Sequence, residues 1–377
     1  MENTMPPISV LMKPSSGMCN MHCDYCFYCD ETEKRKQGSY GFMSEETLKN
    51  IICGTLPRAE GGISYAFQGG EPTLRGLDFF RKVIEYEKIY NKHGIRIQNA
   101  LQTNGTLLNE EWCDFLAENH FLVGISIDGI AETHDKYRHF RGKDDPAFEQ
   151  VLKAADLMDR AGVEYNVLTV VNSATAANIA RIYRSYQENG WHWQQYIACL
   201  DPLGEEKGKR PWALTPEIYG KFLIDLFDLW YADLPENRQP YIRQFENWVG
   251  ILMGYPPEAC DQRGICGIQY VCEADGSVYP CDFYMLDEYR LGNFNTDSIY
   301  TIDSKRLETG FLQESFKLSD ECKACDYFAI CRGGCFRNRD KTQNGQYRSY
   351  FCPAYKMIFK ACLPKMLDIA KRFMDHE

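Results

Sequence analysis

The chain has 377 residues, of which 42 are Lys or Arg and 53 are Asp or Glu, giving a formal net charge of −11. This acidic balance argues against a nucleic-acid backbone as the main partner, because phosphates are bound by Lys and Arg. No apolar run reaches the roughly 18 residues that a membrane-spanning helix needs, so we expect no membrane partner. The length exceeds that at which single cores usually stop growing, and two domains are expected.

Six apolar runs in the first two-thirds of the chain predict buried strands, and each except the last precedes a segment of helix length. Parallel strands joined by helical crossovers form either an open doubly wound sheet or a barrel. Six such units without a Rossmann glycine fingerprint favour an α/β fold built as an incomplete (β/α)6 barrel. A predicted helix rich in aromatic residues ends before Pro235, so we expect one domain at 1–234 and a second at 235–377. The predicted strands are residues 8–12, 64–67, 96–101, 122–127, 164–171 and 193–199.

The first clustered cysteines form the motif Cys19-x3-Cys23-x2-Cys26. A [4Fe–4S] cluster held by three cysteines leaves one iron open for a small molecule, whereas a closed cluster normally takes four. Zinc rarely uses this spacing, and a disulfide framework is typical of small secreted domains rather than of a chain this long. The motif therefore predicts chemistry at an open iron.

Nine more cysteines lie between residues 260 and 352, and eight of them suffice for two further clusters. On the pair Cys322-x2-Cys325 alone, zinc and iron–sulfur ligation are equally compatible with the spacing, and the three-cysteine motif favours iron–sulfur. Cys272 leaves the assignment of ligands open, because on spacing alone it can replace Cys266 or Cys281 in a cluster. Many free thiols require a reducing, anaerobic cytoplasm, where we expect the protein to act.

Polar motifs follow or end several predicted strands, in Gln68-Gly-Gly-Glu71, Gln102-Thr-Asn104 and Ser126-Ile-Asp128. The carboxyl ends of parallel strands share one edge of a sheet, which is where such folds place their sites. These motifs and the first cysteine motif are therefore expected to meet at one site.

The runs CNMHCDYC and FQGGEPTL resemble the radical S-adenosylmethionine (SAM) superfamily, and the downstream cysteine series resembles its SPASM extension. The likeness continues through LQTNGTLLNEEW, LVGISIDG and CLDPLGEEKGK and covers nearly the whole chain in the expected order. Gln-Thr-Asn-Gly together with Pro-Cys-Asp-Phe-Tyr narrows it toward the anaerobic sulfatase-maturating enzymes. This resemblance implies an enzyme that converts a Cys or Ser side chain of a substrate polypeptide to Cα-formylglycine.

The resemblance also implies SAM and three [4Fe–4S] clusters as cofactors. The first cluster would be held by Cys19, Cys23 and Cys26, and a fourth-ligand role for Cys29 lies outside the family pattern. Two auxiliary clusters in the second domain would be fully ligated and would serve electron transfer. Their ligands would be Cys260, Cys266, Cys281 and Cys335 for auxiliary cluster I, and Cys322, Cys325, Cys331 and Cys352 for auxiliary cluster II.

The same resemblance places the Gly-Gly-Glu motif beside the methionyl part of SAM. Gly69 and Gly70 would let the backbone approach it, because neither has a Cβ to clash. Glu71 would accept a hydrogen bond from its ammonium group. The alternative is a tight strand-to-helix turn with a capping acid.

Other SAM contacts implied by the resemblance also have simpler alternatives. Ser126 and Asp128 would bind the ribose hydroxyls, although Asp128 could instead cap the chain before Gly129. Arg138 would face the SAM carboxylate, unless it forms a surface salt bridge. Tyr28 and Gln68 match positions that contact SAM or the substrate. The alternative for Tyr28 is a buried tyrosine with a satisfied hydroxyl.

Three residues are assigned to the substrate and the chemistry. Gln102 and Asn104 would order the substrate backbone, with a polar strand terminus as the alternative. A radical derived from SAM would take a β-hydrogen from the target residue, and auxiliary cluster I would accept the second electron. Asp282, directly after a proposed ligand of that cluster, would serve as the base, unless it stabilises the local turn.

The partners implied are an unfolded or nascent sulfatase polypeptide and an electron donor such as flavodoxin or ferredoxin. Two other classes of protein share part of the pattern. A peptide maturase that forms thioether or carbon–carbon crosslinks would carry the same clusters and barrel. An electron-transfer iron–sulfur protein would need no open iron, so we favour the sulfatase maturase.

Overall fold

The computed structural model describes residues 7–143, 145–236 and 238–374. The chain forms two compact units, each built from three separate segments. The boundary predicted after residue 234 does not coincide with an end of either unit. The first unit consists of Met1–Ser126, Arg138–Tyr165 and Ile268–Phe311, and the second of Ile127–Tyr137, Asn166–Gly267 and Leu312–Glu377.

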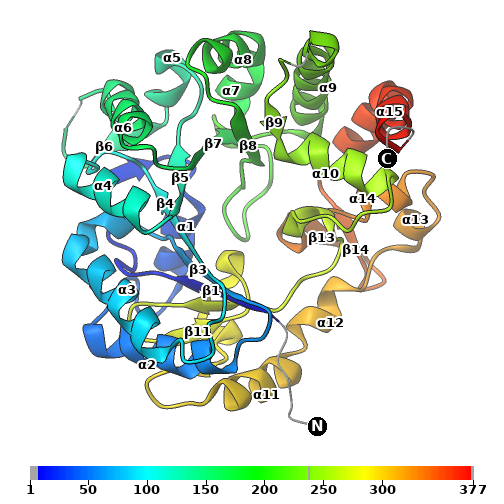
Figure 1. The fold of residues 1–377 in the computed structure, drawn as a ribbon. Coiled ribbons are helices and arrows are strands. Elements are labelled where there is room, and N and C mark those ends of the chain that lie inside the picture. The colour runs from blue at the N-terminus through cyan, green and yellow to red at the C-terminus, as the bar shows by residue number, and fades with distance from the viewer. Residues whose placement is uncertain (1–6, 144, 237, 375–377) are drawn as a thin grey trace. The chain divides into compact units, whose positions relative to one another are not determined.

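The first unit is organised around a mostly parallel sheet in which β1, β3, β4 and β5 are paired in that order (Figure 1). These strands confirm the first four predicted ones to within two residues. They span Ile8–Met12, Ile63–Phe67, Ile97–Thr103 and Leu122–Ser126. The helices of this unit are α1 (Phe27–Lys34), α2 (Glu45–Thr55), α3 (Leu77–Tyr90), α4 (Glu110–Glu118), α6 (Phe148–Ala161) and α11 (Ile299–Thr309).

Alternating burial explains why these segments form strands, as in β3, where Tyr65 and Phe67 are fully buried and the alternate residues Ser64 and Ala66 are half-buried. Phe80 of α3 packs edge-to-face against Phe67, with ring centroids 5.1 Å apart, and against Trp112 of α4 at 5.2 Å. Each such pair contributes about 0.5–1.5 kcal/mol beyond the area it buries. These contacts fix α3 and α4 against the sheet, so the loops that follow the strands have a rigid support.

The segment after residue 268 adds strands that the sequence did not predict. β10 (Tyr270–Cys272) pairs in parallel with β1, and β11 (Ser277–Tyr279) and β12 (Gly292–Asn293) continue the sheet antiparallel. Cys272, whose ligand role the spacing left open, is fully buried opposite Met12. The pairing places the residues after β11 beside the first strand.

A separate two-stranded sheet joins β2 (Met21–Cys23) to β6 (Arg138–Phe140), with Cys23 opposite Arg138. Neither strand was predicted. Because β2 lies inside the three-cysteine motif, this pairing holds the motif against a segment far along the chain.

The second unit combines short parallel strands with long helices. β7 (Tyr165–Val171) and β8 (Trp193–Ala198) confirm the last two predicted strands, and β9 (Tyr241–Ile242) pairs with β8. α15 packs against α9 and α10. Among the described residues, no helix is both long and apolar enough to cross a membrane. The remaining elements include α5 (Ala131–His134), α7 (Ser173–Ala177), α8 (Ile179–Glu188), α9 (Pro216–Asp233), α10 (Arg243–Leu252), α12 (Phe311–Ser315), α13 (Asp320–Lys323), α14 (Phe328–Cys331), β13 (Arg339–Lys341), β14 (Tyr347–Ser349) and α15 (Cys352–Met374).

Candidate active site

A buried ion pair in the first unit involves Asp282, the first residue of the short helix η5 (Asp282–Tyr284). Its Oδ1 contacts Nζ of Lys13, whose side chain is fully buried directly after β1. Its Oδ2 accepts a hydrogen bond of 2.9 Å from Nε2 of Gln68, directly after β3. Two donors from two strand ends thus hold one carboxylate in a site from which most water is excluded.

Lys13 is a member of this site that the sequence analysis missed. Its ammonium group also lies 4.4 Å from the centroid of the Tyr28 ring, a favourable cation–π distance. Gly69 makes room for it, because a Cβ at this position, where φ is +97°, would lie 2.1 Å from Cδ of Lys13. The available signal was a single cation at the end of a predicted buried strand, at the edge where the polar motifs were expected to meet.

Tyr28 is buried in α1, and its hydroxyl donates to Oε2 of Glu273 at 2.8 Å. The same carboxylate oxygen accepts from Nη1 of Arg35 at 2.6 Å. Burial and the neighbouring Glu273 raise the pKa of Tyr28 well above its ordinary value. The contacts therefore match the alternative of a buried tyrosine with a satisfied hydroxyl, and a direct contact of Tyr28 with SAM stays a prediction.

Glu71 is buried and already accepts four hydrogen bonds. Oε1 receives the backbone and hydroxyl donors of Thr73 at 3.0 and 2.6 Å and the hydroxyl of Thr103 at 2.7 Å, while Oε2 receives the backbone N–H of Asn104 at 2.8 Å. A carboxylate offers about four lone-pair sites. Oε2 accepts one of these bonds and keeps a second lone-pair site, so the acceptor role toward the SAM ammonium stays a prediction beside the capping contact with Thr73.

Gly70 is required by a close approach within the chain itself. Its φ is +53°, and an added Cβ would lie 2.0 Å from the carbonyl oxygen of Met18, which precedes the first cysteine of the motif. The adjacent N–H of Glu71 donates to that same oxygen at 2.8 Å. The two glycines thus make room for Lys13 and for the Met18 carbonyl, and the approach of their backbone to SAM stays a prediction.

Cys19, Cys23 and Cys26 are half-buried near β2 and the start of α1. Burial raises the pKa of the Cys19 thiol to about 11. A thiol with such a pKa keeps its proton near neutral pH unless a metal displaces it, and its role as a cluster ligand stays a prediction. Cys29 hydrogen-bonds to Cys26 and lowers the pKa of Cys26 below its ordinary value.

Arg138 is buried beside the cysteine motif rather than exposed in a surface salt bridge. Its Nη1 lies 4.0 Å from Sγ of Cys23, and its guanidinium lies 5.6 Å from the ring centroid of Tyr25. The β2–β6 pairing explains this position. A contact between Arg138 and the SAM carboxylate remains a prediction that this placement supports.

The residues that end β4 form hydrogen bonds within the first unit. Asn104 donates from Nδ2 to Oδ1 of Asn20 at 2.9 Å and lies 3.9 Å from Sγ of Cys19. Gln102 donates to the hydroxyl of Ser126 on the neighbouring strand at 3.1 Å. These contacts agree with polar strand ends, and the predicted roles toward substrate and ribose stay predictions.

In the second unit, Asp128 is fully buried, and its Oδ1 accepts from the backbone N–H of Val170 at 2.9 Å. The helix after it, α5, starts at Ala131 with Ile130 as its N-cap. Asp128 is thus not the cap of that helix.

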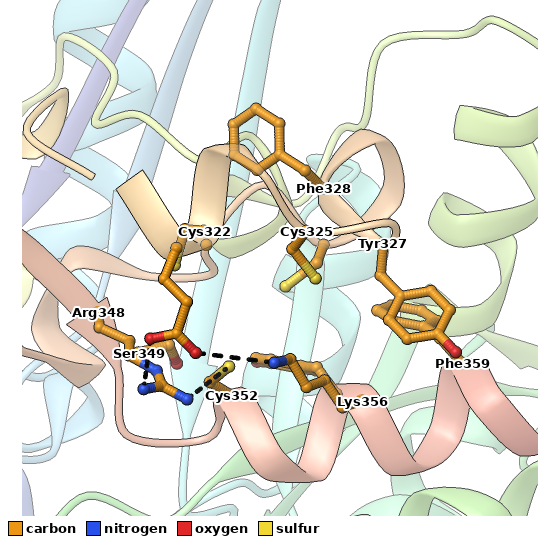
Figure 2. Close-up of a pocket in the computed structure, with 13 residues that line it drawn as sticks. Cys322, Cys325, Tyr327, Phe328, Arg348, Ser349, Cys352, Lys356 and Phe359 are labelled. Atoms are coloured by element: carbon orange, nitrogen blue, oxygen red, sulfur yellow. Dashed lines mark hydrogen bonds and ion pairs between the residues drawn. The ribbon is translucent and has the colours of Figure 1, made fainter. Parts of the chain in front are cut away.

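A pocket in the second unit is lined by Cys322, Cys325, Cys331 and Cys352, and Figure 2 shows the first two and Cys352 directed into it. Burial raises the pKa of Cys331 to about 12, so its thiol also needs a metal to lose its proton at neutral pH. Among the described residues, no three His, Cys, Asp or Glu side chains converge tightly enough to hold a single metal ion. The pocket brings together the four cysteines that the resemblance assigns to auxiliary cluster II, and their role as cluster ligands stays a prediction.

A further group of thiols in this unit comprises Cys260, Cys266 and Cys335. Burial raises the pKa of Cys335 to about 12 and that of Cys266 to about 11, and the neighbouring thiols of the group add to these shifts. The fourth predicted ligand of auxiliary cluster I, Cys281, belongs to the first unit, and its ligand role stays a prediction.

Known proteins match this chain over nearly its whole length. Residues 14–185 match the family model of the radical SAM superfamily, and residues 266–326 match SPASM, an iron–sulfur cluster-binding domain. A cysteine-type anaerobic sulfatase-maturating enzyme of Clostridium perfringens (strain 13) is 43% identical over 368 residues, which cover 97% of this chain and 99% of the relative. The chain belongs to the anaerobic sulfatase-maturating enzymes.

Other relatives of this sulfatase-maturating enzyme agree. A serine-type enzyme of Bacteroides thetaiotaomicron is 32% identical over 394 residues, covering 98% of this chain and 93% of the relative. The solved structure of native anSMEcpe with bound AdoMet and Cp18Cys peptide aligns with 98% of this chain and 100% of that chain, with a TM-score of 0.91 and 42% identity. These matches confirm the predicted radical SAM fold with its SPASM extension.

Gly70→Ala should destabilise this sulfatase-maturating enzyme, because the left-handed conformation costs a residue with a Cβ about 1–2 kcal/mol and the clash with Met18 adds to that cost. Denaturant unfolding under anaerobic conditions measures the loss. Gly94→Ala is the matched control, since Gly94 has φ +63° and none of the described residues lies within 4 Å of the added Cβ. Equal losses for the two variants would show that the approach to Met18 carries no cost.

Proposed function

We propose that this chain oxidises Cβ of a cysteine in an unfolded or nascent sulfatase polypeptide, producing Cα-formylglycine, with SAM and three [4Fe–4S] clusters as cofactors. The preference for cysteine rests on the relatives: cysteine-type enzymes of Clostridium perfringens and Clostridium novyi are 43% and 40% identical, whereas the serine-type enzyme of Bacteroides thetaiotaomicron is 32% identical. A flavodoxin or ferredoxin in a reducing cytoplasm would supply the electrons.

The buried carboxylate of Asp282 is the observation that carries this proposal. When bound, SAM and the cluster of the three-cysteine motif supply the radical that removes a hydrogen atom from the target Cβ. Asp282 then accepts the proton of the target thiol, and auxiliary cluster I would take the second electron, which leaves a thioaldehyde on the substrate. Water would hydrolyse this thioaldehyde to the aldehyde and release hydrogen sulfide. Lys13 compensates the buried negative charge beforehand, and Gln68 fixes the direction of the second carboxylate oxygen.

The cluster ligands in this proposal are those that the resemblance implied. The fully buried position of Cys272 inside β10 favours Cys266 and Cys281 as ligands over a register that uses Cys272. Cys29 contacts Cys26 and keeps an unassigned role. The three sets are Cys19, Cys23 and Cys26; Cys260, Cys266, Cys281 and Cys335; and Cys322, Cys325, Cys331 and Cys352.

Iron analysis tests the ligand sets. Anaerobically reconstituted protein should contain roughly 12 irons per chain if three [4Fe–4S] clusters bind. The combined change Cys19→Ala, Cys23→Ala and Cys26→Ala should remove about four of these irons and abolish SAM cleavage. A wild-type content near four would contradict the auxiliary ligand sets.

Asp282→Asn keeps the shape of the side chain but cannot accept a proton, so formylglycine formation should fall by about 10²–10⁴-fold. Cluster content and SAM binding should survive. Deuterium from a β-labelled peptide should still appear in 5′-deoxyadenosine, because hydrogen abstraction precedes the loss of the thiol proton. Asp287→Asn, at an exposed position in the same region, is the control. If Asp282→Asn forms product at the wild-type rate with intact clusters, Asp282 is not the base.

Mass spectrometry of a Cys-x-Pro-x-Arg peptide after anaerobic turnover tests the reaction itself. Formylglycine should appear from the cysteine peptide faster than from its serine counterpart. A crosslinked product in place of an aldehyde would instead favour a peptide maturase, and faster turnover of the serine peptide would reverse the proposed preference.

A further inference from the structure

Arg339, the first residue of β13, is a buried cation whose hydrogen bonds all go to backbone carbonyls. Nε donates to Gly333 at 3.1 Å, Nη1 to Ser315 at 2.7 Å, and Nη2 to both Gly264 and Gly334 at 2.7 Å. Four of the five N–H groups are therefore used. Within the described part of the chain, no carboxylate forms an ion pair with this guanidinium.

The carbonyls that Arg339 binds lie in the loops that carry the proposed cluster ligands. Gly264 lies two residues before Cys266, and Gly333 and Gly334 lie between Cys331 and Cys335. These loops touch directly, because an added Cβ on Gly264 would lie 2.4 Å from the carbonyl oxygen of Arg332. The guanidinium thus ties together ligand loops of both auxiliary sites.

A buried charge needs a compensating charge. Burial lowers the pKa of Arg339, and four cysteines oppose that shift. Cys335 and Cys266 belong to the proposed set of auxiliary cluster I, and Cys322 and Cys331 to that of cluster II. As free buried thiols these groups would be neutral near pH 7, whereas metal ligation makes them thiolates. Since an arginine stays protonated in proteins, its charge is compensated only when the clusters are bound.

We propose that Arg339 is a positioning residue shared by the two auxiliary clusters, whose fixed positive charge raises the reduction potentials of both. Reduction adds one electron to a cluster and makes it more negative, so a neighbouring cation stabilises the reduced form. The inference rests on the ligand sets of the proposed function. It concerns their electrostatics and is independent of the identity of the peptide substrate.

Spectroelectrochemical titration of the auxiliary clusters tests this inference in the full chain carrying Cys19→Ala, Cys23→Ala and Cys26→Ala, which leaves only those two clusters. Adding Arg339→Met removes the charge. At a fixed potential, the ratio of reduced to oxidised cluster should fall about tenfold at both sites, which is 59 mV for a one-electron couple. Arg339→Lys keeps the charge and should hold both potentials near those of the parent protein.

Arg348→Met is the matched control for a local effect. Arg348 lies 3.7 Å from Sγ of Cys352, a proposed ligand of cluster II, and its charge is paired with Glu321 at 2.8 Å. Its removal should shift the potential of cluster II and leave that of cluster I near the parent value.

Separate outcomes decide each part. Unchanged potentials in Arg339→Met with full iron content would overturn the present inference alone, whereas a low iron content in the wild-type protein would overturn the ligand sets beneath it. If Arg339→Met fails to assemble clusters, Arg339→Lys decides between charge and hydrogen bonding. Full iron content in Arg339→Lys supports the need for a positive charge. An equal loss of iron in both variants shows that only the hydrogen bonds of the guanidinium matter and refutes the electrostatic role.

Discussion

The parallel pairing of β10 with β1 is the constraint on which the first unit depends. It brings the Cys281 and Asp282 region to the end of the first strand, where Lys13 meets the carboxylate. Burying two charges costs several kcal/mol each, so such a pair is weak evidence for stability. The presence of Lys13, Asp282 and Gln68 in one buried network is better explained by chemistry than by folding.

The second unit also contains a buried charge that needs compensation. The guanidinium of Arg339 is buried and has no carboxylate partner among the described residues, which is unfavourable for an uncompensated charge. Under the proposed ligand sets, metal-bound thiolates carry the negative charge that Arg339 needs. The burial of this cation together with the cysteines thus agrees with the proposed clusters of this unit.

The Gly-Gly-Glu motif shows how a functional motif can serve the fold first. Gly69 and Gly70 are required by the close approach of Lys13 and of the Met18 carbonyl. Glu71 accepts hydrogen bonds from the turn that follows it and from the end of the next strand. Each contact joins a strand end of the predicted sheet to the three-cysteine motif or to the buried ion pair. The motif therefore holds the loops of the site together, and the contact of its carboxylate with SAM stays a prediction.

The sequence by itself determined the parallel strands, the three-cysteine motif and the family, because period-two burial, cysteine spacing and short motifs are local signals. It did not predict β2 and β6, or β10 to β12, since these short strands exist only through partners distant in the chain. For the same reason Lys13 and Arg339 were missed: each is an ordinary cation in the sequence. Only the tertiary structure gives them their roles, by burying each charge where distant segments meet.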